Sequence, residues 1–143
     1  MADDDRPSME RTFTLAEANA ALGEVRPLAE RLVAHRRSLA AAQTRQAGVA
    51  TQIAANGGDL SPQDVREAAS EVERAVAGIA DCLQRLDALG VQVKDIDVGL
   101  LDFPARRRSG EPVLLCWKVG EPEVAYWHGE DEGFAGRRPL PLD

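Results

Sequence analysis

The feature that most constrains the fold is a long run of side chains at helical spacing in the first half of the chain. Apolar side chains, with two polar ones among them, recur every three or four residues: Leu15, Ala18, Leu22, Val25, Leu28, Leu32, His35, Leu39, Ala42, Gln46, Val49 and Ile53. This spacing places them on one face of an α-helix. A helix of about 40 residues is about 60 Å long, whereas a compact chain of 143 residues has a radius of gyration of about 14 Å. The helix must therefore project from the rest of the protein.

Short-range signals indicate where this first helix begins and bends. Thr14 suits the N-cap position, and Glu17 three residues later completes a capping box. Pro27 lies inside the run, where its missing N–H and its ring disturb the helical hydrogen bonds. We therefore expect the helix to begin at Thr14 and to bend near Arg26.

A second helix follows a break in the pattern. Asn56-Gly57-Gly58-Asp59 interrupts the first run, and Ser61 followed by Pro62 restarts it with a cap and a proline at the first helical position. Gly90 suits the left-handed conformation that ends many helices. Between these limits apolar positions again recur every three or four residues: Val65, Ala68, Val72, Val76, Ile79, Leu83 and Leu86. The two runs together predict a helical hairpin.

Beyond Gly90 the apolar side chains alternate with a period of two, which is typical of strands. A small antiparallel meander has to cover its apolar face, and the base of the hairpin is the nearest surface. The predicted fold class is therefore α+β, a long, coiled-coil-like antiparallel helical hairpin followed by a small antiparallel β meander. The expected strands lie within residues 91–93, 99–103, 113–119 and 124–128, with turns at 108–111 and 120–123.

The chain divides into three segments. Residues 1–12 form an acidic N-terminus that we expect to be disordered, residues 13–90 form the hairpin, and residues 91–143 form a β head with the C-terminal tail. The hairpin and the head are expected to fold as one unit. Two helices alone leave an Ala-rich seam of this length partly uncovered, and a second copy of the chain covers it in a four-helix arrangement. We therefore predict a homodimer formed through the helical hairpin.

The composition limits the classes of function. With 44% hydrophobic and 29% charged residues the chain has the balance of a globular protein, and no apolar run approaches the ~18 residues of a membrane span. The net charge of −7 argues against a nucleic-acid partner. The first residues lack the apolar stretch of a signal peptide, and Cys82 and Cys116 form no CxxC motif. We expect a cytoplasmic protein with no membrane or nucleic-acid partner.

The motifs of common enzymes are absent from the sequence, which contains no P-loop, GxGxxG, GxSxG, HExxH or EF-hand loop. We therefore assign no catalytic residue, and an enzyme is not the favoured class. His35 lies on the helical seam and is interpreted as a polar residue that sets the register of the helices, rather than as a ligand. Cys116, in the middle of a strand, is interpreted as a buried and unreactive thiol.

One candidate site is a metal site at the end of the last expected strand. His128 closes that strand, and Gly129 lets the chain turn back so that Asp131 approaches the imidazole. An imidazole together with carboxylates is a mixed ligand set that suits zinc, manganese or iron(II). The alternative is that Asp131 orients His128 or caps the turn without any metal.

A second candidate is a pocket for a small anion. Arg106 and Arg137 offer planar guanidinium groups to a carboxylate or a phosphate, with His128 as a further donor. Acidic residues of the head belong to the same polar cluster. The candidate ligand-binding residues are therefore His128, Asp131, Asp97, Asp102, Arg106 and Arg137.

Ten short segments, in their order and spacing, carry a resemblance to one protein family. They are Phe13-Thr14-Leu15, Glu17-Ala18-Asn19, Arg26-Pro27-Leu28, Lys94-Asp95-Ile96-Asp97, Gly99-Leu100, Asp102-Phe103-Pro104-Ala105, Cys116-Trp117, Gly120-Glu121-Pro122, Trp127-His128 and Gly133-Phe134-Ala135-Gly136-Arg137. From Phe13 to Leu140 the chain resembles the prokaryotic family catalogued as domain of unknown function 2203. The resemblance implies a small stand-alone protein and carries over no activity. Gly129 and Gly23 depart from the family pattern, which usually has an acidic residue and often a proline there.

The sequence thus predicts a protein of unknown function, a small cytoplasmic homodimer with a helical stalk whose β head binds a small ligand or a divalent metal. Two alternatives stay open. One is an interaction or scaffold protein that uses the coiled-coil hairpin and has no ligand site. The other is a metal-dependent enzyme in which Asp97 or Asp102 acts as the base, and it requires a metal with an open coordination position.

Overall fold

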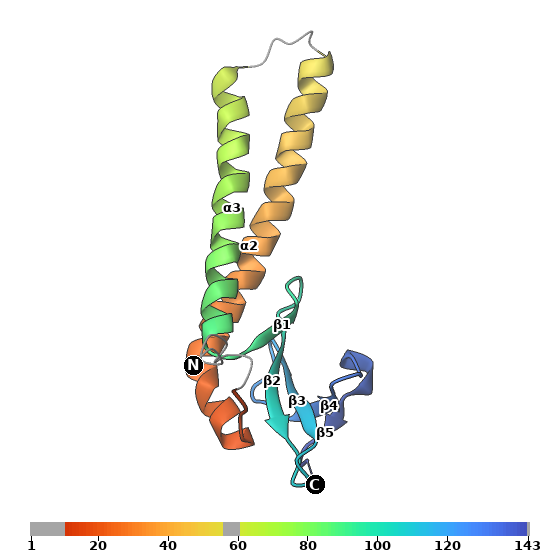
Figure 1. The fold of residues 1–143 in the computed structure, drawn as a ribbon. Coiled ribbons are helices and arrows are strands. Elements are labelled where there is room, and N and C mark those ends of the chain that lie inside the picture. The colour runs from red at the N-terminus through yellow and green to blue at the C-terminus, as the bar shows by residue number, and fades with distance from the viewer. Residues whose placement is uncertain (1–10, 56–60, 143) are drawn as a thin grey trace, which may run out of the picture.

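Two helices form a long hairpin that stands on a small β-sheet (Figure 1). The computed structural model describes residues 11–55 and 61–142. Helix α2 spans Leu15–Ala55, and helix α3 spans Pro62–Ala88 and packs against it in the opposite direction. The 41 residues of α2 confirm the length that the apolar spacing predicts. The predicted α+β class is confirmed as well.

The helix ends use the signals that the sequence offers. The Thr14 N–H donates to Glu17 Oε1 over 2.9 Å, and the Glu17 N–H donates to Thr14 Oγ1 over 3.0 Å. Ser61 caps α3 by accepting a hydrogen bond from the Gln63 N–H over 3.1 Å. Gly90 follows α3 with a φ of +89°, a left-handed conformation that glycine adopts without strain. The predicted capping box, cap and terminator are therefore confirmed.

Pro27 lies inside α2 without ending it. The first turns of the helix, drawn in orange-red, lean away from the direction of the longer part above them (Figure 1). A bend of this kind is what the missing N–H and the ring of a proline produce in a helix interior. Residues 1–10 of the expected disordered N-terminus, and the expected break at residues 56–59, lie outside the described residues.

Five strands form one antiparallel sheet in the order β1-β2-β3-β4-β5. They are β1 (Gln92–Asp95), β2 (Leu100–Arg106), β3 (Pro112–Lys118), β4 (Tyr126–Gly129) and β5 (Arg138–Pro139). The predicted meander is confirmed. Two elements were not expected, the short 3-10 helix η2 (Phe134–Gly136) and strand β5, which pairs with β4. Both are too short to show a periodic pattern in the sequence.

One face of the sheet, which we call the apolar face, packs against the base of the hairpin. Its side chains share a single buried core with the first half of α2, the end of α3 and Phe13. The ring of Phe13 meets that of Phe103 edge-on, with 5.1 Å between the ring centroids. The residues of the apolar face are Leu101, Phe103, Ala105, Val113, Leu115, Trp117 and Trp127.

Hydrogen bonds tie the same two parts together. The Phe13 N–H donates to the carbonyl oxygen of Pro104 on β2 over 2.7 Å. The side chain of Asn19 on α2 accepts a hydrogen bond from the Val124 N–H, also over 2.7 Å. The start of α2 is therefore fixed on the sheet by polar contacts as well as by the core.

Above the sheet the stalk consists of the two helices. The His35 ring of α2 lies against Gly78 of α3, where a Cβ would come within 2.6 Å of the ring atoms. Since glycine has no side chain, the helices can approach closely at this level, and His35 fills the seam. None of the described helices combines the length and the hydropathy that a membrane crossing requires.

Candidate functional site

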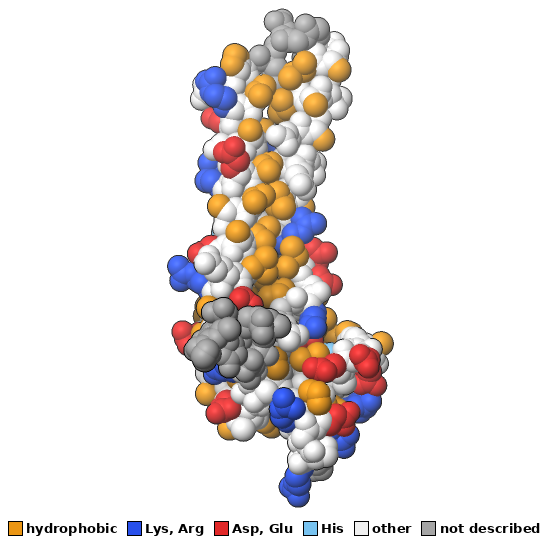
Figure 2. Space-filling model, viewed as in Figure 1, with side chains coloured by type: hydrophobic (Ala, Val, Ile, Leu, Met, Phe, Trp, Pro, Cys, Tyr) orange, Lys and Arg blue, Asp and Glu red, His pale blue; other side chains and the backbone are white. Residues whose placement is uncertain are grey.

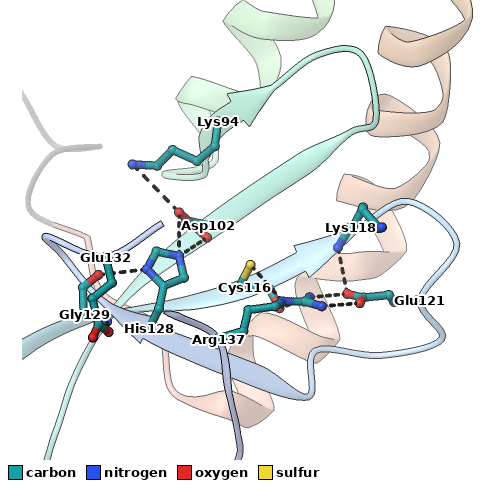
Figure 3. Close-up of polar contacts among 9 residues, drawn as sticks. All are labelled: Lys94, Asp102, Cys116, Lys118, Glu121, His128, Gly129, Glu132 and Arg137. Atoms are coloured by element: carbon teal, nitrogen blue, oxygen red, sulfur yellow. Dashed lines mark hydrogen bonds and ion pairs between the residues drawn. The ribbon is translucent and has the colours of Figure 1, made fainter. Parts of the chain in front are cut away.

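Strand register brings three side chains with metal-ligating atoms together on the other face of the sheet, which we call the polar face. Asp102 of β2 lies directly opposite Cys116 of β3. His128 of β4 lies opposite Leu114, two residues along β3 from Cys116. Residues two apart on a strand point to the same side, so the three side chains share this face. We call Asp102, Cys116 and His128 the Asp–Cys–His cluster (Figure 3).

The cluster is compact and buried. A carboxylate oxygen, the thiol sulfur and an imidazole nitrogen of its three residues lie within 4.8 Å of one another. His128 Nε2 is 3.1 Å from both carboxylate oxygens of Asp102. The exposed fraction is 1% for Asp102, 0% for Cys116 and 3% for His128. At this degree of burial the three groups need hydrogen-bond partners within the protein, because bulk water does not reach them.

The second ring nitrogen of His128 orients the imidazole. Nδ1 lies 2.8 Å from the carbonyl oxygen of Gly129, which is an acceptor, so Nδ1 carries a hydrogen and donates it. The Gly129 N–H in turn donates to Glu132 Oε1 over 2.8 Å. This arrangement turns Nε2 toward Asp102, and a hydrogen bond there requires one proton between the imidazole and the carboxylate.

Cys116 is held by Arg137, which follows η2. Arg137 Nε donates to Cys116 Sγ over 3.4 Å (Figure 3). Burial raises the pKa of the Cys116 thiol from 9.0 to about 11, although the hydrogen bond from Arg137 opposes this shift. The thiol is therefore protonated at neutral pH, and the burial expected for this cysteine is confirmed.

Arg137 also forms an ion pair with Glu121, and two of its nitrogens meet the carboxylate at 2.6 and 2.7 Å. Burial by itself raises the pKa of Glu121, but hydrogen bonds from Arg137 and from the Lys118 N–H outweigh it and lower that pKa. For Arg137, burial lowers the pKa of the guanidinium, and the hydrogen bond to Glu121 more than reverses this effect. The pair is therefore charged at neutral pH and covers the sulfur of Cys116.

Lys94 of β1 lies between the cluster and the solvent. Its Nζ lies 3.8 Å from Asp102 Oδ2, and 41% of the lysine side chain is exposed. In Figure 3 Lys94 reaches Asp102 from β1, while Arg137 approaches Cys116 from the C-terminal segment. The carboxylate and the thiol of the cluster thus each have a cationic neighbour.

Three of the candidate ligand-binding residues predicted from the sequence lie together on this face. His128 and Asp102 are in direct contact, and Arg137 joins them through Cys116. The third residue of the cluster, Cys116, was not among the ligands predicted from the sequence. Its position opposite Asp102 follows from the pairing of β2 with β3, which the alternation of apolar residues does not specify.

The other three nominated residues lie elsewhere. Asp97 accepts a hydrogen bond from Arg36 of α2 over 2.9 Å, and Arg106 donates to the carbonyl oxygen of Gly110 over 2.9 Å. Asp131 is exposed in the turn after β4. In the part of the chain that the structure describes, these groups do not converge with the Asp–Cys–His cluster on one ligand position.

Comparison with known proteins identifies a family but no individual relative. No curated protein and no solved structure matches the sequence. The model of a family described as an uncharacterized conserved protein matches residues 11–140, a stretch that includes the whole Asp–Cys–His cluster. The chain therefore belongs to this family, DUF2203, as the resemblance of its short segments predicts.

Proposed function

We propose that the β head binds a divalent transition metal, zinc above all, through Asp102, Cys116 and His128. The observation that carries this proposal is the approach of an oxygen, a sulfur and a nitrogen ligand atom within 4.8 Å of one another. In a tetrahedral zinc site, bonds of about 2.0–2.3 Å put the ligand atoms roughly 3.3–3.8 Å apart. Small side-chain shifts are therefore enough for the cluster to close around an ion.

The groups around the cluster suit metal ligands. A metal-binding histidine usually donates its other ring N–H to a carbonyl or a carboxylate, and the Nδ1–H of His128 meets the Gly129 carbonyl over 2.8 Å. The Arg137 N–H that points at Cys116 Sγ over 3.4 Å stabilises a thiolate in the same place. A set with sulfur and nitrogen donors favours zinc over magnesium and calcium, which prefer oxygen ligands.

Exchange of protons for a metal keeps the buried charge constant. Without a metal the cluster holds two protons that a bound ion would displace, one on Cys116 and one between His128 and Asp102, while the Nδ1–H of His128 stays in place. A divalent cation that takes their place leaves the net charge of the buried groups unchanged, so the interior does not have to accommodate an uncompensated charge. Metal binding is then accompanied by the release of protons.

Three protein ligands leave the fourth coordination position to a water molecule or to a small ligand. The small ligand that the sequence predicts for the β head would bind at this position. The alternative function, a metal-dependent enzyme, would need the same position for its substrate or for a reactive water.

We also propose that the protein acts in the cytoplasm. Its two cysteines, Cys82 and Cys116, are free and buried, which suits a reducing compartment.

Metal content and ligand identity are tested together. We expect elemental analysis of untagged protein to find about one zinc per chain. Cobalt(II) added to the zinc-free protein is expected to give the charge-transfer absorption of a cobalt–thiolate bond. His128→Ala should lose the metal, and Cys116→Ser should lose the thiolate absorption. Cys82→Ser removes the other buried thiol and should keep both signals, which makes it the matched control.

The variant Asp131→Ala distinguishes the Asp–Cys–His cluster from the metal site that the sequence predicts in the turn after β4. Because Asp131 is not part of the cluster, this variant is expected to bind metal as the wild type does. Loss of metal in Asp131→Ala together with full binding in Cys116→Ser would move the site to that turn. A folded wild-type protein that takes up neither zinc nor cobalt would refute the proposal and favour an interaction protein without a ligand site. Circular dichroism of every variant establishes that the fold is retained.

A further inference from the structure

Helix α3 carries a set of apolar side chains that the hairpin does not fully bury. Its buried positions are Ala68, Ala75, Cys82 and Leu86. A different set, which we call the α3 stripe, recurs at alternating intervals of four and three residues: Val65, Ala69, Val72, Val76, Ile79 and Leu83. Such heptad spacing is that of a helix–helix seam. Ile79 and Leu83 pack on the core at the base of the stalk, whereas Val65 and Val76 are 42% and 49% exposed.

The α3 stripe belongs to one side of the stalk, which we call the stripe side. The opposite side is an open groove whose lining includes the charged residues Arg45, Glu71 and Arg74. Figure 2 shows a continuous band of hydrophobic atoms along the stalk between the two helices. On α2, heptad positions without a charge adjoin this band: Leu39, Gln43, Gln46, Ala50 and Ile53. Depletion of charge is typical of the centre of a protein interface.

We propose that the stripe side binds a second copy of this chain, with the two stalks antiparallel and the β heads at opposite ends of the dimer. The free part of the stalk begins at Arg36, where Asp97 of the β1–β2 turn reaches α2. From there to Ala55 the helix is about 30 Å long, and two helices side by side are about 20 Å wide. Each copy therefore offers about 600 Å², and the total of about 1,200 Å² reaches the size of stable, specific interfaces.

The chemistry of the two helices sets the orientation. A twofold axis across the stalks places α3 against the α3 of the other copy and α2 against its α2, whereas an axis along the stalks places α3 against α2. In the first case the valines of the α3 stripe are buried against each other. Gln43 and Gln46 then meet the same amides of the other copy, which can both donate and accept hydrogen bonds. In the second case Val72 and Val76 cover these amides and leave them without partners, which is costly.

The position of the β head on the stalk also favours the antiparallel arrangement. Arg36 lies three residues before Leu39 and so on the stripe side of α2, and its contact with Asp97 over 2.9 Å shows that the β1–β2 turn reaches that side. In the antiparallel dimer this turn faces the tip of the other stalk. With the heads at the same end, the two turns would instead compete for the space between the stalks.

The mass of the particle in solution tests the dimer. We expect light scattering after gel filtration to give twice the chain mass of 15.4 kDa for the wild type and 15.4 kDa for Val76→Glu. Val76 is 49% exposed in the single chain, so a glutamate there is compatible with a folded monomer, which circular dichroism checks. Ala77→Glu places the same charge one residue away, off the α3 stripe, and should stay dimeric. A wild-type mass of 15.4 kDa, or a dimeric Val76→Glu, would overturn the proposal.

Cysteine cross-linking tests the orientation. Val72 lies near the middle of the free part of α3 and hence near the twofold axis, so oxidised Val72→Cys is expected to form a disulfide-linked dimer. Val65→Cys should not, because seven residues displace it about 10 Å from the axis in each copy, beyond the reach of a disulfide. The native thiols of Cys82 and Cys116 are buried and do not compete. Cross-linking at both positions, or at neither position in a dimer, would overturn the antiparallel arrangement.

Discussion

Both faces of the sheet have a buried centre, but different kinds of interaction bury the two. The apolar face packs on the base of the hairpin, where shape and volume decide the fit. The polar face is closed by Arg137 and its neighbours, and every buried side-chain nitrogen and oxygen in the described part of the chain has a hydrogen-bond partner. The apolar face can therefore accept other residues of similar volume, whereas the polar face depends on each partner being present.

The largest effect is expected on the apolar face. Trp117→Ala removes a fully buried ring, and with it the hydrogen bond from Nε1 to the Glu121 carbonyl oxygen over 3.0 Å. The free energy of unfolding should fall by about 4 kcal/mol, because the cavity cannot collapse completely. Urea denaturation followed by circular dichroism measures this loss. Trp127→Ala, on β4 and 7% exposed, should lose less. Equal losses would show that packing is as tight at both positions.

On the polar face, removal of one partner of the buried pair is expected to cost slightly less. Asp102→Ala or His128→Ala should each lower the free energy of unfolding by about 3 kcal/mol, because the remaining partner stays buried without its hydrogen bonds. The double variant should lose less than the sum of the two single losses. A double-mutant cycle from urea denaturation measures the difference. Additive losses would contradict a coupled pair.

Acid is expected to lower the free energy of unfolding by protonating Glu121, the partner of Arg137 on the polar face. Its pKa in the folded protein is lowered from 4.5, mainly because Arg137 outweighs the effect of burial. The stabilisation is therefore fully present above pH 4.5 and is lost as the pH falls through the lowered pKa, since the unfolded chain takes up the proton first. In Arg137→Gln the urea midpoint should decrease less steeply over this range than in the wild type. Identical slopes would assign the acid sensitivity to other carboxyl groups.

The smallest effect is expected at the rim of the same face. Arg138 meets Glu132 over 2.7 Å, but the two side chains are 46% and 38% exposed. Such a pair is screened by water and salt, so Arg138→Ala should lower the free energy of unfolding by at most about 1 kcal/mol. The loss should shrink further in high salt. A loss as large as that of Asp102→Ala would show that the rim belongs to the buried part of the polar face.

The apolar face and the helices could be predicted from the sequence because their signals are periodic or local. Three-and-four spacing over the 41 residues of α2 and a capping box at Thr14 need no knowledge of distant residues. Alternation in the β region identifies which side chains of one strand share a face. It does not identify which residues of two strands lie opposite each other.

The polar face could not be predicted in the same way because it depends on that pairing. A turn at residues 108–111 would place Trp117 opposite Asp102, whereas the observed pairing of Arg106 with Pro112 places Cys116 there. A difference of one residue thus decides whether a thiol or an indole faces the carboxylate. For His128, sequence proximity favoured Asp131, but the observed partner is 26 residues away.

The hydrogen bond between Asn19 and Val124 joins residues 105 positions apart, and the core that surrounds it unites the first helix with the last strands. Contacts of such long sequence separation form late, because a long loop has to close before they can. On the ribosome, the base of α2 therefore emerges well before the strands that cover it. Until then Leu22, Val25 and Leu28 are open to other chains, and we expect this interval to be the stage of synthesis most prone to aggregation.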